Sequence, residues 1–319
     1  MTLVISGYNH CTGYTYDYSE CIEKGVIKTP TSKSEREPGL FSIADSVITT
    51  IGKGGKVPLL KGFKKVVNIP IKLWQPYIAG SHFRGYKTVF KECECFVAFA
   101  GSTLTSQHVI NLISNHLSML RIDYRPKIQE KGEFIVIKNC DHNVLVSTAD
   151  FAHHSEGLFI PELDYKGILT AEIVVDVVEH SINTALKSAK EFRLSEDAFN
   201  EMYTEFTLGL NCPASGKDYL YHFQMDKRLN HEGVYEVFAN RKYIPENSVS
   251  VIGMRKQFGD RINDIVDFSI DNNLNLCDEL IKFMKTAIDE VDASGSFEIG
   301  MPVVVKKLVD GELRKALVE

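Results

Sequence analysis

The sequence contains no hydrophobic run long enough to cross a bilayer, and its first residues lack the charged-then-apolar pattern of a secretion signal. It is also short of basic residues, because the formal net charge is -6 and the isoelectric point is near 6.0. This charge provides no basic field for a phosphate backbone, which argues against nucleic acid as the principal partner. We therefore expect a cytoplasmic protein that binds neither membranes nor nucleic acid.

Motifs for cofactors and disulfides are also missing. No Gly-x-Gly-x-x-Gly fingerprint or Walker loop follows a strand pattern, so dinucleotide and NTP binding have no support. The seven cysteines form no Cys-x-x-Cys pair, and their odd number favours reduced thiols. Potential metal ligands lie close together in the sequence at three places: Cys93 and Cys95; Cys140, Asp141 and His142; and His153 and His154. These spacings match no closed zinc site, so the sequence predicts no metal and no other cofactor.

The chain has an ordinary globular composition, with 44% apolar and 24% charged residues among 319. This is enough to bury a substantial core. Short strand patterns cover about 2–8, 40–44, 63–69 and 96–100. Between them lie two irregular segments, at about 9–38 and 70–92, the second of which contains the only tryptophan, Trp74. We interpret 1–319 as a single domain that carries these two insertions.

Apolar residues at intervals of three and four predict two long helices, over about 103–120 and 174–189. Alternating patterns predict strands at 206–210, 220–225, 234–238 and 249–252. Two further helices are expected around 262–266 and 280–291, the latter opened by Asn275, and a hairpin around Asp310-Gly311 closes the chain. This order of strands, two helices, strands, two helices and strands is typical of an α+β protein whose antiparallel sheets pack on helices.

The second residue carries the chemistry of interest. Met1 is followed by Thr2, which is small enough for ordinary methionine removal. Removal would leave Thr2 with a hydroxyl and a free α-amine on one residue, which is a nucleophile with its own base. Many proteins begin in this way, so the interpretation depends on the rest of the chain.

Three motifs, Phe41 to Ser46, Phe63 to Ile69 and Phe99 to Leu104, resemble the second strand, the lysine-bearing strand and the Ala-Gly helix entry of proteasome β subunits. The C-terminal segments Ile252-Gly253, Phe258 to Asp260, Leu276 to Leu280 and Ile299 to Val303 resemble the Anbu-type bacterial relatives of the proteasome. The chain is thus similar to proteasome-like N-terminal-nucleophile (Ntn) hydrolases. The resemblance implies a four-layer αββα sandwich of antiparallel sheets.

The resemblance also implies roles for individual residues. Thr2 would be the nucleophile, and its α-amine, with a pKa near 8, would be the base. Lys65 would act as a fixed cation that lowers the pKa of the Thr2 hydroxyl, and Asp45 would hold Lys65 in place. The backbone N–H of Gly101 would bind the acyl oxyanion.

Substrate contacts are implied in the same way. The backbone near Thr49 would pair with an extended peptide by strand addition. The matched first pocket consists of Ile48, Phe63, Val67, Phe99 and Thr103. Since none of these residues is charged, the resemblance implies cleavage after hydrophobic residues.

The sequence departs from the family at several positions. Val47 stands where proteasome β subunits usually have arginine, and the segment between Thr2 and Asp45 is longer than usual. The supporting Asp and Ser late in the chain have Asp292 and Ser294 as their candidates. Such departures raise the possibility of a changed substrate or lost activity.

The sequence therefore predicts a threonine-type peptidase that works on peptides or unfolded proteins inside a homo-oligomeric ring or open helical ring. One alternative is an inactive scaffold or binding subunit of the same fold. A second alternative is an amidohydrolase that uses the same nucleophile on small molecules. The sequence does not identify the natural substrate, the subunit number or an ATPase partner.

Overall fold

A computed structural model of the chain describes residues 2–9, 38–52, 55–79, 82–127, 130–147, 165–192 and 194–318. The first predicted insertion, at about 9–38, lies outside the described residues apart from its two ends, and so do His153 and His154. Within the described ranges, no helix combines the length and apolarity needed to cross a bilayer.

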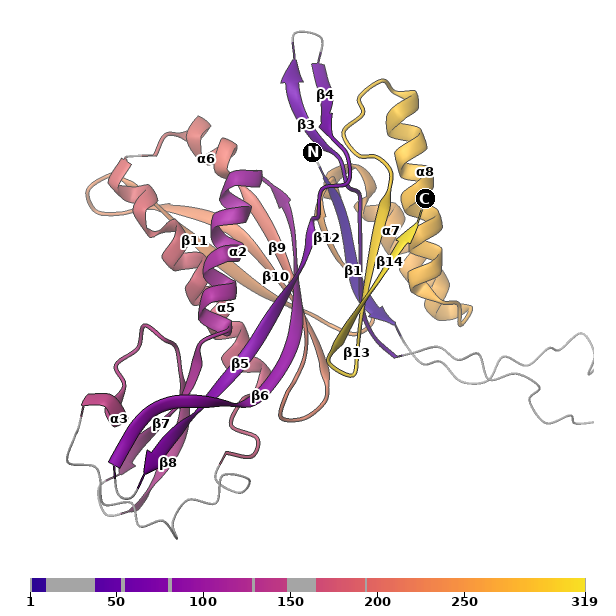
Figure 1. The fold of residues 1–319 in the computed structure, drawn as a ribbon. Helices are drawn as coiled ribbons and strands as arrows, with labels where there is room; N and C mark the ends of the chain where they lie inside the picture. The colour runs from indigo at the N-terminus through magenta and orange to yellow at the C-terminus, as the bar shows by residue number, and fades with distance from the viewer. Residues whose placement is uncertain are drawn as a thin grey trace, which may run out of the picture.

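Two antiparallel sheets form the centre of the molecule (Figure 1). The five-stranded sheet has the order β12-β1-β2-β13-β14, with β1 at Leu3–Asn9, β2 at Gly39–Ala44, β12 at Ser250–Gly253, β13 at Val303–Val309 and β14 at Glu312–Val318. The seven-stranded sheet has the order β11-β10-β9-β6-β5-β7-β8. Its strands are β5 at Val66–Ala79, β6 at His82–Gly101, β7 at Leu120–Lys127, β8 at Glu130–Ile137, β9 at Thr204–Asn211, β10 at Asp218–Leu229 and β11 at Tyr235–Ile244. One neighbouring pair in it, β5 with β7, runs parallel.

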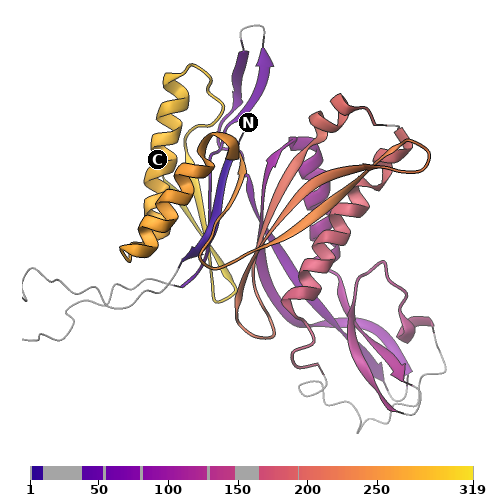
Figure 2. The ribbon, with the colours of Figure 1, turned by 180° about the vertical axis from the view of Figure 1, so that it is seen from behind.

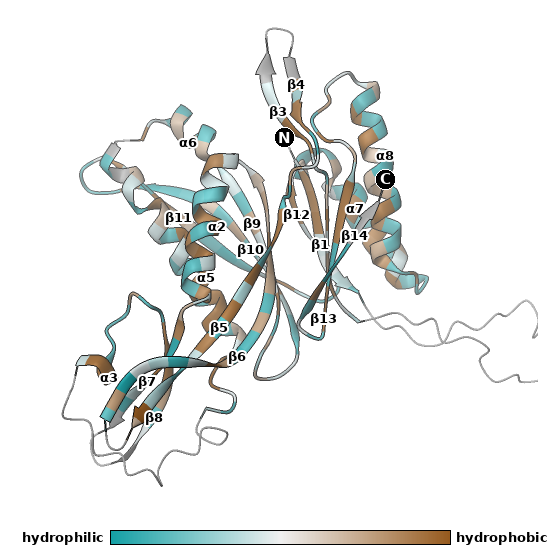
Figure 3. Ribbon diagram, in the orientation of Figure 1, coloured by the Kyte–Doolittle hydropathy of each residue, from teal (hydrophilic) through white to brown (hydrophobic). Residues whose placement is uncertain are grey.

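Helices cover the outer face of each sheet, as Figures 1 and 2 show from opposite sides. Helices α2 (Thr103–Leu117) and α5 (Ala171–Leu186) pack on the seven-stranded sheet and close one hydrophobic core with it. Helices α7 (Arg255–Asp271) and α8 (Leu276–Ala293) close a second core with the five-stranded sheet. Apolar and polar residues alternate around these helices in Figure 3, because only one face of each is buried.

A third core lies between the two sheets. It contains apolar residues of β1 and β2 on one side and of β6 and β10 on the other, with Phe96 fully buried among them. Gly209 of β9 lies directly against Phe96, since a Cβ on this glycine would be 2.2 Å from the ring. The layers therefore run helices, sheet, sheet, helices, and the prediction of an α+β protein with antiparallel sheets packed on helices is confirmed.

Several predicted elements are confirmed and others differ. Asn275 caps α8 by accepting the Asp278 N–H at 3.3 Å, and β13 and β14 form the closing hairpin. The predicted order was wrong in placing the first two helices in succession, because β7 and β8 lie between them. The second predicted insertion, at about 70–92, consists largely of strand: β5 and β6 continue through it as one long hairpin, and the Trp74 indole N–H donates to the Ser118 carbonyl at 2.9 Å.

Smaller elements that the sequence pattern did not indicate complete the fold. Strands β3 (Ile48–Gly52) and β4 (Gly55–Leu60) form a two-stranded sheet beside the N-terminus. Within the described residues, short helical segments are also present as α3 (Val144–Ser147), η2 (Lys187–Phe192) and α6 (Glu196–Met202). Of these, β3 and α6 contribute residues to the cavity described next.

Candidate active site

A buried ion pair lies where β2 ends and β5 begins. Asp45 follows β2 and is fully buried, and Lys65 precedes β5 and is 3% exposed. The Lys65 ammonium donates to both carboxylate oxygens of Asp45, at 2.9 and 2.8 Å. Two charges buried in this way need hydrogen bonds on every side to offset the loss of water.

The remaining partners of the pair are backbone groups. The Asp45 carboxylate accepts the N–H groups of Leu3 at 3.0 Å and Val47 at 3.1 Å, and Lys65 donates to the Val47 carbonyl at 2.6 Å. Val47 therefore contributes through its main chain, so this contact does not depend on which side chain stands at position 47. Within the described residues, the hydrogen bonds of Lys65 go to Asp45 and Val47, and none goes to the Thr2 hydroxyl.

Thr2 is fixed on both sides. Its neighbour Leu3 binds Asp45, and its own carbonyl accepts the Met254 N–H at 2.9 Å. Gly253 passes so close that a Cβ there would lie 1.8 Å from the Thr2 carbonyl oxygen, and its φ of +88° is unfavourable for other residues. The β1 to β12 pairing and the Asp45 carboxylate together determine where Thr2 lies.

Burial changes the proton affinity of the pair. It lowers the pKa of the Lys65 ammonium, and the Asp45 carboxylate opposes this shift. It raises the pKa of the Asp45 carboxyl, which Lys65 and the two backbone N–H groups oppose. A lysine in this environment is closer than a solvated one to the proton affinity that acid–base work at neutral pH requires.

Thr2 lines a cavity of about 500 Å³ that lies where the ends of the two sheets meet. This volume lies within the range of small-molecule and substrate sites. The cavity is lined by Thr2, Thr49, Thr50, Ala100, Gly101, Ser102, Asn200, Glu201, Tyr203, Glu205 and Gly253. Three of the predicted site residues, Thr2, Thr49 and Gly101, are thus brought to one cavity, and the fold places Asp45 and Lys65 next to it.

Gly101 is the last residue of β6, and both its backbone conformation and its close packing require glycine, which the sequence alone did not reveal. Its φ is +125°, and a Cβ would lie 2.2 Å from the Tyr203 carbonyl oxygen. The Ser102 N–H donates to that same carbonyl at 3.0 Å. The turn from β6 into α2 therefore packs directly on the start of β9, and this contact brings Tyr203 and Glu205 to the cavity.

The cavity lining includes acidic residues, whereas the predicted first pocket contains none. Phe99 is a core residue and packs edge-on against Phe63 at 6.1 Å, and Val67 packs against the same core. These three residues, with Ile48 and Thr103, do not line the cavity. Glu201 and Glu205 line it instead, so this cavity is a different one from the predicted uncharged pocket, which stays a prediction.

Glu205 is a partly buried acid that lines the same cavity as Thr2. Its Oε2 accepts the Gly253 N–H at 2.9 Å, and the Tyr203 hydroxyl donates to its Oε1 at 3.4 Å. Burial raises the pKa of Glu205, and the Gly253 N–H opposes the shift. Burial, followed by the charge of Glu205, raises the pKa of the Tyr203 phenol to about 12. Sequence patterns could not identify these residues, because their position follows from the pairing of β6 with β9.

The structure does not bring Asp292 and Ser294 to this cavity. Both are exposed, Asp292 in the last turn of α8 and Ser294 at its C-cap. The Ser294 hydroxyl donates to the Val291 carbonyl at 2.7 Å and so completes the helix end. A different polar group lies nearer the ion pair: the Ser46 hydroxyl is fully buried and has no hydrogen-bond partner among the described residues.

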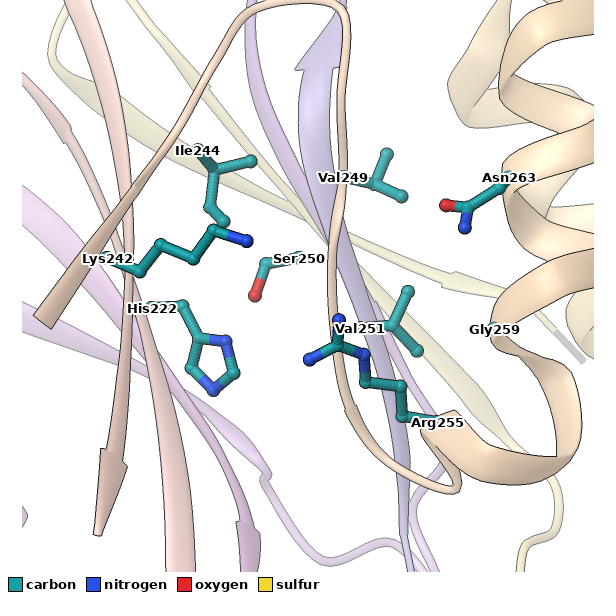
Figure 4. Close-up of a pocket in the computed structure, with 9 residues that line it drawn as sticks. All are labelled: His222, Lys242, Ile244, Val249, Ser250, Val251, Arg255, Gly259 and Asn263. Atoms are coloured by element: carbon teal, nitrogen blue, oxygen red, sulfur yellow. The ribbon is translucent and has the colours of Figure 1, made fainter. Parts of the chain in front are cut away.

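A second, smaller cavity of about 70 Å³ adjoins β10, β11, β12 and α7 (Figure 4). The basic side chains of His222, Lys242 and Arg255 converge on it. Burial, together with the charges of Arg255 and Lys242, lowers the pKa of His222 to about 4. His222 Nε2 lies 3.8 Å from Glu205 Oε1, so the two cavities are neighbours.

Comparison with protein-family models finds no match to this sequence, and comparison with curated proteins finds none either.

Proposed function

We propose that the chain is an N-terminal threonine hydrolase of the Ntn type, with Thr2 as its nucleophile. The observation that carries the proposal is the Asp45 carboxylate, which binds Lys65 and the backbone N–H next to Thr2 at the same time. The layer order of helices, sheet, sheet and helices supports the Ntn-hydrolase fold, and the cavity in front of Thr2 provides room for a substrate.

The proposed reaction begins with removal of Met1, which frees the Thr2 α-amine. The Thr2 oxygen then attacks the substrate carbonyl carbon while the α-amine accepts the hydroxyl proton. As the amide C–N bond breaks, this proton passes to the leaving amine, and an ester to Thr2 remains. Water adds to the ester and releases the acid and Thr2.

Other groups would stabilise charge during these steps. The Lys65 ammonium favours the developing alkoxide because it is buried and fixed by Asp45. The backbone at Gly101 is proposed as the oxyanion donor, since this residue lines the cavity with Thr2. Loss of one such donor typically raises the barrier by about 2.7–4 kcal/mol.

The residues that line the cavity suggest the kind of substrate. Thr49 and Thr50 of β3 border the cavity, so an extended peptide along β3 would bring its carbonyl to Thr2. Glu201 is exposed and contributes a carboxylate, which favours a basic or hydrogen-bond-donating side chain next to the scissile bond.

A second candidate function is an inactive scaffold of the same fold. It is favoured by the hydrogen bonds of Lys65, which go to Asp45 and Val47 and leave none for Thr2 among the described residues. In that case the ion pair would serve only to join β1, β2 and β5.

Intact mass and peptide turnover distinguish the two functions. For the hydrolase we expect loss of Met1, cleavage of fluorogenic peptides, abolition of turnover in Thr2→Ala and partial retention in Thr2→Ser. Thr88→Ala is the matched control, because Thr88 is an exposed threonine outside the cavity lining and its loss should leave the reaction intact. Retained Met1 together with no turnover by the wild type would favour the scaffold, and equal turnover in Thr2→Ala and the wild type would exclude Thr2 as the nucleophile.

The proposal includes assembly of several copies around the sites. The β3–β4 hairpin exposes three large apolar side chains, Val57, Leu59 and Leu60, at 49%, 60% and 58%. An exposed apolar group of this kind is typical of an interaction surface. Mass photometry of the wild type and of Leu59→Glu tests this point: we expect an oligomer that the substitution weakens, and a wild-type monomer would contradict it.

A further inference from the structure

Three potential metal ligands from distant parts of the sequence meet on the helical side of the seven-stranded sheet. They are His116 in the last turn of α2, Cys140 in the loop after β8 and His180 in α5. One ligand atom of each lies within 4.8 Å of those of the other two. In the sequence, Cys140 was considered only together with its neighbours Asp141 and His142. Spacing along the chain could not detect a group of ligands that are far apart in the sequence.

The hydrogen bonds around His116 fix which nitrogen is available. His116 Nδ1 lies 2.8 Å from the Ser181 hydroxyl oxygen, and that hydroxyl donates its own proton to the Val177 carbonyl at 2.6 Å. The His116 Nδ1–H must therefore be the donor to Ser181. Nε2 is left with its lone pair, and a metal-binding histidine characteristically has its other nitrogen held in this way.

His180 and Cys140 already have a separation suited to one metal ion. The Cys140 Sγ and His180 Nε2 atoms are 3.5 Å apart. Thiolate and imidazole ligands at their usual distances from a tetrahedral zinc ion are about 3.6 Å apart. The Thr184 hydroxyl lies 3.4 Å from the same nitrogen, and α5 supplies this group and His180 from adjacent turns.

The surroundings of both imidazoles shift them toward the neutral form. Burial lowers the pKa of His116, and His180 and Lys138 lower it further. Burial and Lys138 lower the pKa of His180 as well, and Asp141 opposes both shifts. Metal ligation requires the unprotonated ring, so this environment is compatible with binding.

We propose that His116, Cys140 and His180 form a zinc site with two imidazole ligands, one thiolate and a fourth position open to water. A thiolate with two imidazoles suits zinc and copper among the biological metals. On binding, the Cys140 thiol loses its proton to solvent and its sulfur bonds to the ion. The site would join α2, α5 and the loop after β8.

The site is separate from the proposed catalytic centre. Thr103 begins α2 beside Gly101, and His116 lies thirteen residues further along the same helix. At 1.5 Å per residue this places the zinc ligands about 20 Å from the cavity end of the helix. We therefore assign the metal a stabilising role that does not depend on the proposed hydrolase function.

Zinc binding to the full-length protein tests the proposal directly. After treatment with a chelator, we expect one Zn²⁺ per chain in competition with a chromophoric chelator, a rise in Tm, and protection of Cys140 from alkylation. Co²⁺ in place of Zn²⁺ should give the thiolate-to-cobalt absorption band. Ser181→Ala, which removes the partner of His116, should weaken zinc about 10- to 100-fold.

Matched variants identify the ligands. Cys140→Ser and His180→Gln should each weaken zinc more than Ser181→Ala does, and Cys140→Ser should abolish the cobalt band. His142→Gln is the control, because His142 is in the same loop but hydrogen-bonds to Ser147 at 3.1 Å. Circular dichroism without metal shows whether each variant folds. The proposal is overturned if the wild type binds no zinc at one equivalent, or if Cys140→Ser and His180→Gln, both folded, bind it as tightly as the wild type does.

Discussion

The Leu3 backbone N–H donates to the Asp45 carboxylate at 3.0 Å, and the same carboxylate binds the Lys65 ammonium at 2.8 and 2.9 Å. The residue after Thr2 and the buried cation therefore share one acceptor. A movement of Asp45 would therefore shift the backbone next to Thr2 and the Lys65 ammonium at the same time. This link connects stability to the proposed chemistry and motivates the first prediction.

Replacing Asp45 with Asn should destabilise the protein strongly. The substitution leaves the Lys65 charge buried without its counter-ion, and breaking a buried pair in this way typically costs about 3–5 kcal/mol. Urea denaturation measures the free energy of unfolding. The control is Lys72→Met in the exposed pair with Glu92, for which we expect about 0–1 kcal/mol. Similar losses in the two variants would contradict the view that Asp45 neutralises a buried charge.

Gly253→Ala should disturb the position of Thr2. The new Cβ would collide with the Thr2 carbonyl oxygen, and the backbone has a φ of +88°. Gly62→Ala is a close control because its φ is +79° but no atom lies within 4 Å of the added Cβ. Both substitutions place alanine at a positive φ and so share that energetic cost. The difference between their free energies of unfolding therefore measures the effect of the steric clash at Gly253. We expect Gly253→Ala to lose more stability and, if the chain is a hydrolase, its turnover; equal losses would exclude a steric role.

Glu201→Gln should change substrate preference. If the Glu201 carboxylate faces a basic group of the substrate, its removal should lower kcat/KM for basic peptides by up to about fivefold, as expected for a partly solvated ion pair. Neutral peptides should be cleaved as before. Asp197→Asn, in the same helix but outside the cavity lining, provides the comparison. An equal effect of Glu201→Gln on basic and neutral peptides would argue against charge recognition.

Stability should fall in mild acid because of His222. Its pKa in the folded protein is about 4, against an ordinary value of 6.5, so the unfolded chain binds more protons between these values. The free energy of unfolding should therefore decrease as pH falls from about 6.5 to about 4, by on the order of 3 kcal/mol from this group. His222→Gln should flatten that part of the profile, whereas the exposed His108→Gln should leave it unchanged. A profile that keeps its slope in His222→Gln would show that another group is responsible.

The long amphipathic helices were predictable because each buries one stripe against one sheet, and Asn275 marks the start of α8 with a side chain that caps it. Strands β7 and β8 were missed because the helical pattern was extended to Leu120, which belongs to β7. The continuation of β5 and β6 through 70–92 was missed because many residues there are only partly buried, so the alternation is weak.

The site was predictable only where it depends on local sequence. Asp45 and Lys65 lie at a strand end and a strand start, and each is recognisable from its own segment. Glu205 and Tyr203 reach the cavity through the pairing of Gly101 with Thr204, which joins residues about a hundred positions apart. Asp292 and Ser294 failed because α8 continues to Ala293, which turns this segment into an exposed helix end.

The contact between Lys65 and Val47 depends on the main chain at position 47 and not on its side chain. Since position 47 supplies a main-chain oxygen, its side chain can change during evolution while the ammonium keeps its third acceptor. A substitution at position 47 that keeps the backbone in place therefore leaves this hydrogen bond to the ammonium available.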